Sequence, residues 1–453
     1  MPLSLLAMIL ACSPEARSPA APVPLPAVPS AEPWAESLAA PVPALPPTAT
    51  CPDADGDGFP SALVCPATAP EQADCDDTAP AVTPATERWV RPGPFLMGSA
   101  GGEAGRDEQP VHVVTLSGFC LDRLEVDTAS WAAARGEAPP PPDRTPLPAE
   151  GLTWEQARDL CAHLGKALPT EAQWEKAARG GCEGGQDPAR CDPGDLRPYP
   201  WGDAPPDCAR ANHASAGPTG PRPCRGGAQP VGALPAGAGP YGHLDLAGNV
   251  WEYVADPYHP AVYGDGTPRT DPGGPAEGAV HGLRGGAWNT FSANMRVANR
   301  FQDLVMGSAA GVRCARPTAA SVPDAVSPLD LVAVRGEVAR ADGAVLAGRA
   351  LYVTAFDARD LDPTGMPIPG RSPLAEIRLE PNGAARQPFD LPVPRGPEVL
   401  LSAALDAGTS GPAAPPSGSG GVGRLDHLVR VDADLEGLRL LIAPLPPGGS
   451  PAP

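Results

Sequence analysis

Tryptophan is concentrated in one part of this 453-residue chain. Seven of its eight tryptophans fall between residues 88 and 317, where they are spread along the whole stretch. A buried tryptophan covers a large apolar area, so a stretch that holds this many is expected to build a substantial core. The same stretch is rich in glycine and proline, which interrupt regular helices and strands. Residues 88–317 are therefore expected to form a loop-rich globular domain.

The composition of the whole chain limits its partners. The 65 prolines and 52 glycines make up about a quarter of the residues, a level at which part of the length is expected to be linker. The formal net charge of −20 disfavours nucleic acid and anionic membrane surfaces, because both would repel the chain. Such an excess of acid suits cation binding, or simply solubility.

The N-terminus predicts export. Residues 3–11 form an apolar run that is too short to cross a bilayer as a helix and suits the core of a secretory signal. ILAC at 9–12 resembles a bacterial lipobox, which implies that residues 1–12 are a lipoprotein signal peptide and that Cys12 is lipidated. Neither Lys nor Arg precedes the run, so a chance apolar N-terminus remains the alternative. Residues 13–50, mostly Pro, Ala and Ser, favour an extended tether from a lipid anchor in the bacterial cell envelope, at the outer membrane or cell surface.

Ten cysteines remain after Cys12, and an even number in an exported chain favours disulfides. Two short irregular loops are flanked by cysteines, which predicts two local bridges, Cys182–Cys191 and Cys208–Cys224. A third loop would be closed by Cys65 and Cys75. The sequence does not assign partners to the other four, which are Cys51, Cys120, Cys161 and Cys314.

Residues 51–87 form an acidic segment that begins like a calcium loop. Asp53, Asp55 and Asp57 alternate, so three carboxylates can converge on one hard cation, and the Phe59 carbonyl offers a further oxygen. An EF-hand loop needs an acidic residue at its twelfth position, but Val64 stands there. The segment is therefore not expected to be an EF-hand.

A second acidic cluster supplies the missing ligands if a Cys65–Cys75 bridge folds the segment back. Its members are Asp74, Asp76 and Asp77. The whole segment resembles the thrombospondin type 3-like acidic calcium repeats of exported proteins. Calcium is expected rather than magnesium, because magnesium rarely uses an all-protein cage. The alternative is an acidic, solvated linker.

Two stretches of the tryptophan-rich region have helical spacing. LTWEQARDLCAHLGK at 152–166 predicts an amphipathic helix that starts near Thr153. LPTEAQWEKAA at 168–178 predicts a second helix, in which Thr170 is the N-cap and Glu171 and Glu175 lie near the positive end of the dipole. Further motifs surround these helices: FLMGS (95–99), GFCLDRLEV (118–126), YPWGD (199–203), DLAGNVWE (245–252), LRGGAW (283–288) and GVRCA (311–315).

In this order, over about half the chain, these motifs resemble the formylglycine-generating enzyme, or sulfatase-modifying factor, family. The resemblance implies an α+β fold for residues 88–317, an irregular variant of the C-type lectin fold with little regular secondary structure. The many glycines and prolines, the two short helices and the scattered aromatics suit such a domain.

The resemblance also implies calcium. Two carboxylates and two backbone carbonyls match the ligands of one family site: those of Asp245, Glu252, Gly248 and Val250. Such a set suits calcium, with water completing the shell, and a loop held only by hydrogen bonds is the alternative. A second family site would use Asn212 and the His213 carbonyl, but its acidic partner would fall at 223–225, where no carboxylate exists.

The stretch GLRGGAWNTFSANMRVANRF at 282–301 has the frame of the family's active site. Aerobic members oxidise a substrate cysteine to formylglycine with Cu(I), a soft ion held by two cysteine thiolates, and oxygen binds beside a serine. Here Ala287 takes the serine position, and Thr290 and Met295 take the cysteine positions. Copper is therefore not expected, and no catalytic residue is assigned. The seven histidines are scattered and match no ligand set of the superfamily's iron-dependent members.

Residues 327–447 contain short β-prone runs separated by turn signals such as Asp342–Gly343. This spacing predicts a C-terminal antiparallel β-sandwich. The region is similar to transthyretin-like modules and shows no cluster of catalytic residue types, so a spacer or adhesion role is expected.

Two functions follow from these observations. The first is a non-catalytic, calcium-stabilised binding or scaffold protein, which presents its lectin-like domain to a protein, peptide or glycan in the cell envelope. The second is a formylglycine-generating-type oxidoreductase that modifies a protein cysteine by a different route. The three replaced active-site residues favour the first.

Overall fold

The computed structural model describes residues 53–442 apart from these gaps: 63–71, 101–104, 143, 145, 183–190, 192–194, 218–219, 265, 279, 304–308, 318, 325–329, 347–349, 362–372, 407–421 and 425–427. The chain divides into two units, Met1–Ala49 and Thr50–Pro453, and the first lies wholly outside the described residues. The predicted signal peptide, the tether and Cys12 lie there. Within the described residues, no helix is both long enough and apolar enough to span a bilayer.

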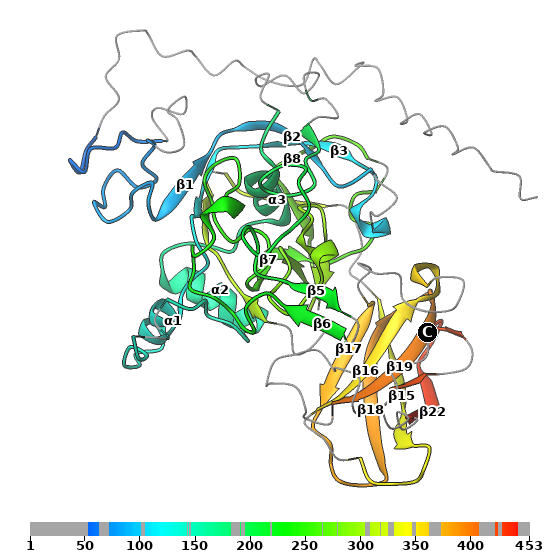
Figure 1. Cartoon of the computed structure of the whole chain (residues 1–453). Helices are drawn as coiled ribbons and strands as arrows, with labels where there is room; N and C mark the ends of the chain where they lie inside the picture. The colour runs from blue at the N-terminus through cyan, green and yellow to red at the C-terminus, as the bar shows by residue number, and fades with distance from the viewer. Residues whose placement is uncertain are drawn as a thin grey trace, which may run out of the picture. The chain divides into compact units, whose positions relative to one another are not determined.

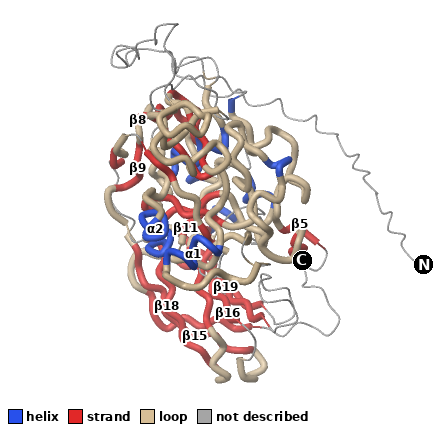
Figure 2. The backbone as a smooth tube through the Cα atoms, turned by 90° about the vertical axis from the view of Figure 1, so that its left-hand side faces the viewer, coloured by secondary structure: helices blue, strands red, loops and turns tan. Residues whose placement is uncertain are grey.

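Residues 87–324 are built from short strands joined by long irregular loops (Figures 1 and 2). Three of the small sheets have the strand orders β1-β4-β13, β11-β10-β7-β12 and β2-β3-β8, and β9 and β5 pair with β14 and β6. The strands are β1 (Glu87–Val90), β2 (Gly93–Met97), β3 (His112–Leu116), β4 (Phe119–Asp122), β5 (Ala214–Gly217), β6 (Gly220–Pro223), β7 (Trp251–Pro257), β8 (Arg269–Thr270), β9 (Pro272–Pro275), β10 (His281–Arg284), β11 (Phe301–Gln302), β12 (Ala310–Gly311), β13 (Ala315–Pro317) and β14 (Val322–Asp324).

Three α-helices accompany these strands: α1 (Thr128–Ala134), α2 (Trp154–His163) and α3 (Glu171–Arg179). The predicted N-caps of α2 and α3 are confirmed, because the Thr153 and Thr170 hydroxyls each accept a hydrogen bond from the third residue of their helix. In both helices that third residue is a glutamine whose side chain completes a capping box. The expected α+β class is confirmed, with more strand than helix.

The core of this region lies where α2 packs against β7 and β10. Its aromatic members include Trp251, Trp288 and Phe301, and Trp251 and Phe301 stack with ring centroids 4.6 Å apart. A smaller cluster surrounds Trp174 of α3. Tryptophans from distant parts of the sequence thus fill the interior, as their distribution predicted.

Four disulfides join the described cysteines. Cys182–Cys191 and Cys208–Cys224 are confirmed. The predicted Cys65–Cys75 bridge is wrong, since Cys75 is bonded to Cys120, which lies opposite Trp89 across the β1–β4 pair. The fourth bridge joins Cys161 of α2 to Cys314. Cys51 and Cys65 lie outside the described residues.

Residues 331–442 form a three-stranded sheet, β18-β15-β22, and a second sheet, β17-β16-β19-β20, in which β21 also pairs with β19. The two sheets share one hydrophobic cluster that includes Val334, Leu391 and Leu401. The pairing of β15 with β22 is parallel, so the region is not antiparallel throughout. The strands are β15 (Leu331–Arg340), β16 (Ala350–Asp357), β17 (Ala375–Leu379), β18 (Arg386–Pro394), β19 (Glu398–Asp406), β20 (Val422–Arg424), β21 (Val429–Arg430) and β22 (Leu435–Ile442).

Candidate functional site

The frame of the expected active site follows β10. Gly285 and Gly286 have positive φ angles of 90° and 79°, and they turn the chain into the loop that carries Ala287 and Thr290. The Thr290 hydroxyl accepts a hydrogen bond from the Ala287 N–H (2.9 Å) and donates one to the Ala287 carbonyl (3.0 Å). The Thr290 hydroxyl therefore uses its proton and its oxygen in hydrogen bonds within the local turn.

Met295 ends the short 3₁₀ helix η6 (Ser292–Met295) and is 0% exposed. It packs with Ala211 and Ala247, and two partly buried aromatic residues, Tyr199 and Trp201, cover the same cluster. The rings of Tyr199 and Trp201 are stacked, with centroids 5.5 Å apart. The Met295 thioether is thus a core group at the position where the family's second copper ligand would stand.

No cysteine that the structure describes can replace the two copper-binding thiolates of the family. All eight of them are paired in the four disulfides. A disulfide sulfur carries no negative charge and cannot bind Cu(I) as a thiolate does. Within the described part of the chain, the two-thiolate copper site is therefore absent.

Ion pairs that are buried hold the frame in place. Arg284 of β10 pairs with Glu175 of α3, and the guanidinium of Arg300 forms two hydrogen bonds of 2.8 Å to the Glu171 carboxylate. Burial alone would raise the pKa of Glu175, but Arg284 and Arg179 lower it below its usual value. Glu175 is therefore a charged anchor in the interior rather than a partner of the helix dipole alone.

The predicted calcium loop consists of residues 245–252. Glu252 is fully buried, and both its oxygens are in use: Oε2 accepts from Arg313 Nε and from Trp174 Nε1, and Oε1 accepts from Arg313 Nη2, all at 2.6 Å. One Asp245 oxygen accepts from the Gly232 N–H. Glu252 thus acts mainly as the counter-ion of Arg313.

A carboxylate that the sequence did not single out joins this loop. Glu125, just after β4, is buried, and it accepts hydrogen bonds from Asn249 Nδ2 (2.6 Å) and the Val250 N–H (3.1 Å). Burial, Asp245 and Glu252 raise the pKa of Glu125 well above its usual value. Burial also raises the pKa of Asp245. Motif order could not reveal Glu125, because its neighbours lie about 120 residues away in sequence.

These carboxylates fit a calcium ion in part. Three buried acids, Glu125, Asp245 and Glu252, lie around Arg313, and Arg123 also acts on Asp245, so three carboxylates face two guanidinium groups. The oxygens of these three acids do not all lie within 4.8 Å of one another. Among the described residues, the aspartates of the acidic segment do meet that spacing. Both Glu252 oxygens pair with the Arg313 guanidinium, whereas both Glu125 oxygens accept only from neutral amides, so Asp245 and Glu125 are the carboxylates whose charge is left for a cation.

Asn212 and His213 stand beside this loop. Asn212 Nδ2 donates to the Gly227 carbonyl (2.9 Å) and to Asn249 Oδ1 (3.2 Å), whereas the buried Asn212 Oδ1 has no hydrogen-bond partner. The His213 carbonyl accepts from the Cys224 N–H at 2.8 Å. The unpartnered amide oxygen is what a cation ligand would offer.

The acidic segment brings Asp74 and Asp77 of its second cluster close to Asp55 of its first. Backbone hydrogen bonds fold it back: the Ala62 N–H donates to the Asp74 carbonyl (2.7 Å) and the Asp74 N–H to the Pro60 carbonyl (2.9 Å). Two overlapping sets of carboxylates then have oxygens within 4.8 Å of one another, Asp53, Asp55 and Asp57, and Asp55, Asp74 and Asp77. The Cys75–Cys120 bridge secures this arrangement instead of the expected Cys65–Cys75 bridge.

Three carboxylate oxygens in these sets are buried without a hydrogen-bond partner: Oδ2 of Asp55, of Asp57 and of Asp74. Leaving a charged oxygen buried and unpaired is costly, so native proteins pair such atoms with donors or cations. Burial, followed by Asp57, Asp55 and Asp77, raises the pKa of Asp74 to about 6. Asp76 instead pairs with Arg316 (3.3 Å) and its Oδ1 accepts from Thr78, whereas the Phe59 N–H donates to Asp57 Oδ1 at 2.9 Å.

Comparison with known proteins agrees with this frame. Residues 73–318 match the family model of the sulfatase-modifying factor enzyme 1-like domain. The chain therefore belongs to the sulfatase-modifying factor family, which includes the formylglycine-generating enzymes.

Three relatives show the range of this family. The formylglycine-generating enzyme of Streptomyces coelicolor is 29% identical over 54% of this chain and 95% of its own length. The serine/threonine-protein kinase pkn1 of Chlamydia caviae is 31% identical over 50% of this chain, which spans only 37% of that kinase. The inactive C-alpha-formylglycine-generating enzyme 2 of Bos taurus is 35% identical over 30% of this chain and 42% of that protein.

Proposed function

We propose that this chain is a non-catalytic, calcium-stabilised binding or scaffold protein of the sulfatase-modifying factor family. The observation that carries the proposal is the state of the three positions where the copper chemistry would occur. Ala287 has no side-chain donor, the Thr290 hydroxyl closes its own turn, and the Met295 thioether is packed in the core. A relative named as inactive shows that the family includes members without the oxidation.

Calcium is proposed at two places. In the domain, Asp245 and Glu125 would supply carboxylates and Gly248 and Val250 backbone oxygens, while the unpartnered Asn212 oxygen supports a cation beside them. In the acidic segment, the unpartnered oxygens of the converging aspartates support a cation held by oxygen atoms alone.

The remaining parts fit an exported role. Cys12 would carry the lipid anchor, and residues 13–50 would hold the domain away from the membrane. The two sheets of residues 331–442 would act as a sandwich-like spacer or adhesion module. Partially exposed aromatic side chains near Met295, among them the 40% exposed Phe291, suit a protein, peptide or glycan ligand. The acidic chain would not bind nucleic acid.

A turnover assay tests this function. The full chain is supplied with Cu(I), oxygen and a sulfatase-type peptide that contains Cys-x-Pro-x-Arg, and mass spectrometry searches for an aldehyde at the peptide cysteine. The Streptomyces coelicolor relative is the positive control. Folded, calcium-loaded protein is expected to form no aldehyde, because no described thiolate is free to hold the copper. Copper-dependent aldehyde would instead make the chain a formylglycine-generating-type oxidoreductase.

A further inference from the structure

The Cys75–Cys120 disulfide joins the acidic segment to the domain, and the segment itself packs over this disulfide. Cys75, two residues before Asp77, is bonded to Cys120 of β4. Ala62 and Ala73 from the segment pack with this disulfide and with Trp89 in one buried cluster. The two cysteines are only 8% and 3% exposed, so the folded segment shields the bond that attaches it.

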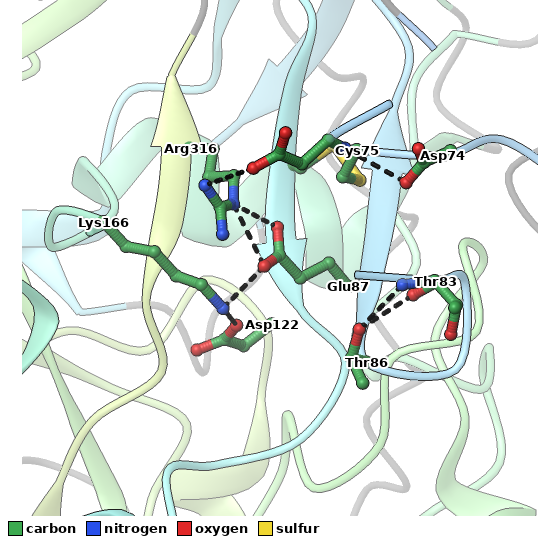
Figure 3. The surroundings of a disulfide bond; sticks show 10 residues. Asp74, Cys75, Thr83, Thr86, Glu87, Asp122, Lys166 and Arg316 are labelled. Carbon is green, nitrogen blue, oxygen red and sulfur yellow. Dashed lines mark hydrogen bonds and ion pairs between the residues drawn. A yellow bond between two sulfur atoms is a disulfide. The ribbon is translucent and has the colours of Figure 1, made fainter. Parts of the chain in front are cut away.

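Ion pairs link the same segment to the domain next to the disulfide (Figure 3). Arg316 of β13 contacts Asp76 (3.3 Å) and Glu87 (2.9 Å), and Lys166 contacts Glu87 Oε1 at 2.7 Å. Lys166 also pairs with Asp122 of β4. These contacts balance the charges of Asp76 and Glu87, but they do not reach the unpartnered oxygens of the neighbouring Asp55, Asp57 and Asp74.

A route to the disulfide exists on its domain side. A cavity of about 290 Å³ is lined by Cys75, Cys120, Gly165, Lys166, Ala167, Ala315, Arg316 and Pro317. Beside this space the two cysteines remain 8% and 3% exposed, because Ala62 and Ala73 pack against the disulfide from the acidic segment. What keeps that packing closed is therefore the stability of the acidic segment.

We propose that cation binding by Asp55, Asp57, Asp74 and Asp77 controls access to the Cys75–Cys120 disulfide. The proposal rests on the cation site proposed above for the acidic segment. With the cation bound, the repulsion between the carboxylates is reduced and the segment stays folded over Trp89 and the disulfide. Without the cation, the aspartates repel one another and the backbone hydrogen bonds at Ala62 and Asp74 open. A phosphine can then attack one sulfur and break the S–S bond, and with water the products are two thiols and the phosphine oxide.

The test follows disulfide reduction in the full chain. A phosphine reductant is added in calcium or in chelator, new thiols are alkylated over time, and mass spectrometry assigns each cysteine. Removing calcium is expected to speed reduction of Cys75–Cys120 about tenfold, because free calcium at ten times its dissociation constant suppresses opening by about that factor. The Cys182–Cys191 bridge, which includes no residue of either proposed calcium site, should keep its rate and serves as the internal control.

A variant distinguishes the effect of calcium bound to the acidic segment from the effect of calcium bound to the domain. Asp55→Asn removes one charge from both carboxylate sets and is expected to give fast reduction even in calcium, whereas Asp159→Asn, on the surface of α2, should not. Calorimetry counts the bound calcium in parallel. Unchanged calcium binding by Asp55→Asn would refute the proposed cation site and this inference with it. Loss of a calcium ion without faster reduction would refute only the control of the disulfide.

Discussion

Replacing Arg313 by methionine should destabilise the domain strongly. Arg313 is fully buried and donates hydrogen bonds to both oxygens of Glu252 (2.6 Å each) and to the carbonyls of Leu244 (2.9 Å), Asp122 and Arg123 (3.2 Å each). Methionine fills much of the same volume but carries no charge. The change therefore leaves Glu252 without its counter-ion beside two other buried acids.

The magnitude follows from that uncompensated charge. Breaking a buried ion pair by removing one partner costs about 3–5 kcal/mol, a large share of the roughly 5–15 kcal/mol that stabilises a typical domain. The loss should be greatest in chelator, since calcium would offset part of the excess negative charge. Adding Glu252→Gln to Arg313→Met should recover part of the stability, because the charge left behind is then removed as well.

Urea unfolding followed by tryptophan fluorescence measures this effect. Seven of the eight tryptophans lie between residues 88 and 317, so the signal reports on this domain and not on the C-terminal sheets. Arg158→Met is the matched control, because Arg158 of α2 is 52% exposed in its pair with Asp159 and should cost less than about 1 kcal/mol. If Arg313→Met unfolds within about 1 kcal/mol of the wild type, the buried pair contributes nothing of the expected size.

Three further predictions concern the sites and the disulfides. Gly248→Ala should cost about 1–3 kcal/mol in urea unfolding, since Gly248 has a φ of 85° and an added Cβ would press against the Asn212 carbonyl oxygen. In calcium-free protein, amide exchange at 53–62, corrected for its intrinsic pH dependence, should increase as the pH rises from about 4 to above 6. The pKa of Asp74 is raised to about 6, so the proton that stabilises the folded segment is lost across that range. Bound calcium should make the exchange rate less dependent on pH. Replacing both Cys161 and Cys314 by alanine should lower the unfolding free energy by about 2–5 kcal/mol, and a smaller loss would mean that the reduced chain keeps its α2 contacts unaided.

Local features of this fold could be predicted from the sequence. The starts of α2 and α3 follow from Thr153 and Thr170, because a capping hydroxyl acts on backbone groups only two or three residues away. The Cys182–Cys191 and Cys208–Cys224 bridges span 9 and 16 residues, so proximity in sequence already implied them.

Features that depend on distant contacts could not be predicted. Cys75 meets Cys120 because β4 pairs with β1, and Cys161 meets Cys314 across 153 residues. The motif at 245–252 likewise identified Glu252 but not its use, since only the fold shows that Arg313 occupies both carboxylate oxygens. The same contact explains why Glu125 becomes the carboxylate of interest beside Asp245.

Restoring the two thiols tests whether the frame itself still suits copper. Thr290→Cys with Met295→Cys is expected to give a chain that binds one Cu(I) in competition with a colorimetric chelator, while each single variant binds much more weakly, because two thiolates are needed to hold this soft ion. The cost should be moderate: Thr290 gives up hydrogen bonds within its turn, and shortening the fully buried Met295 leaves a cavity worth about 1–3 kcal/mol. Ser292→Cys with Met295→Cys is the matched control, with free thiols counted in every sample so that an unwanted disulfide is not mistaken for lost binding.

Copper binding by the first pair and not by the control would mean that the loop from Gly285 to Met295 keeps the ligand geometry of the family, and that residue identity alone removed the chemistry. Equal binding by both pairs, or by neither, would mean that the loop has also lost that geometry.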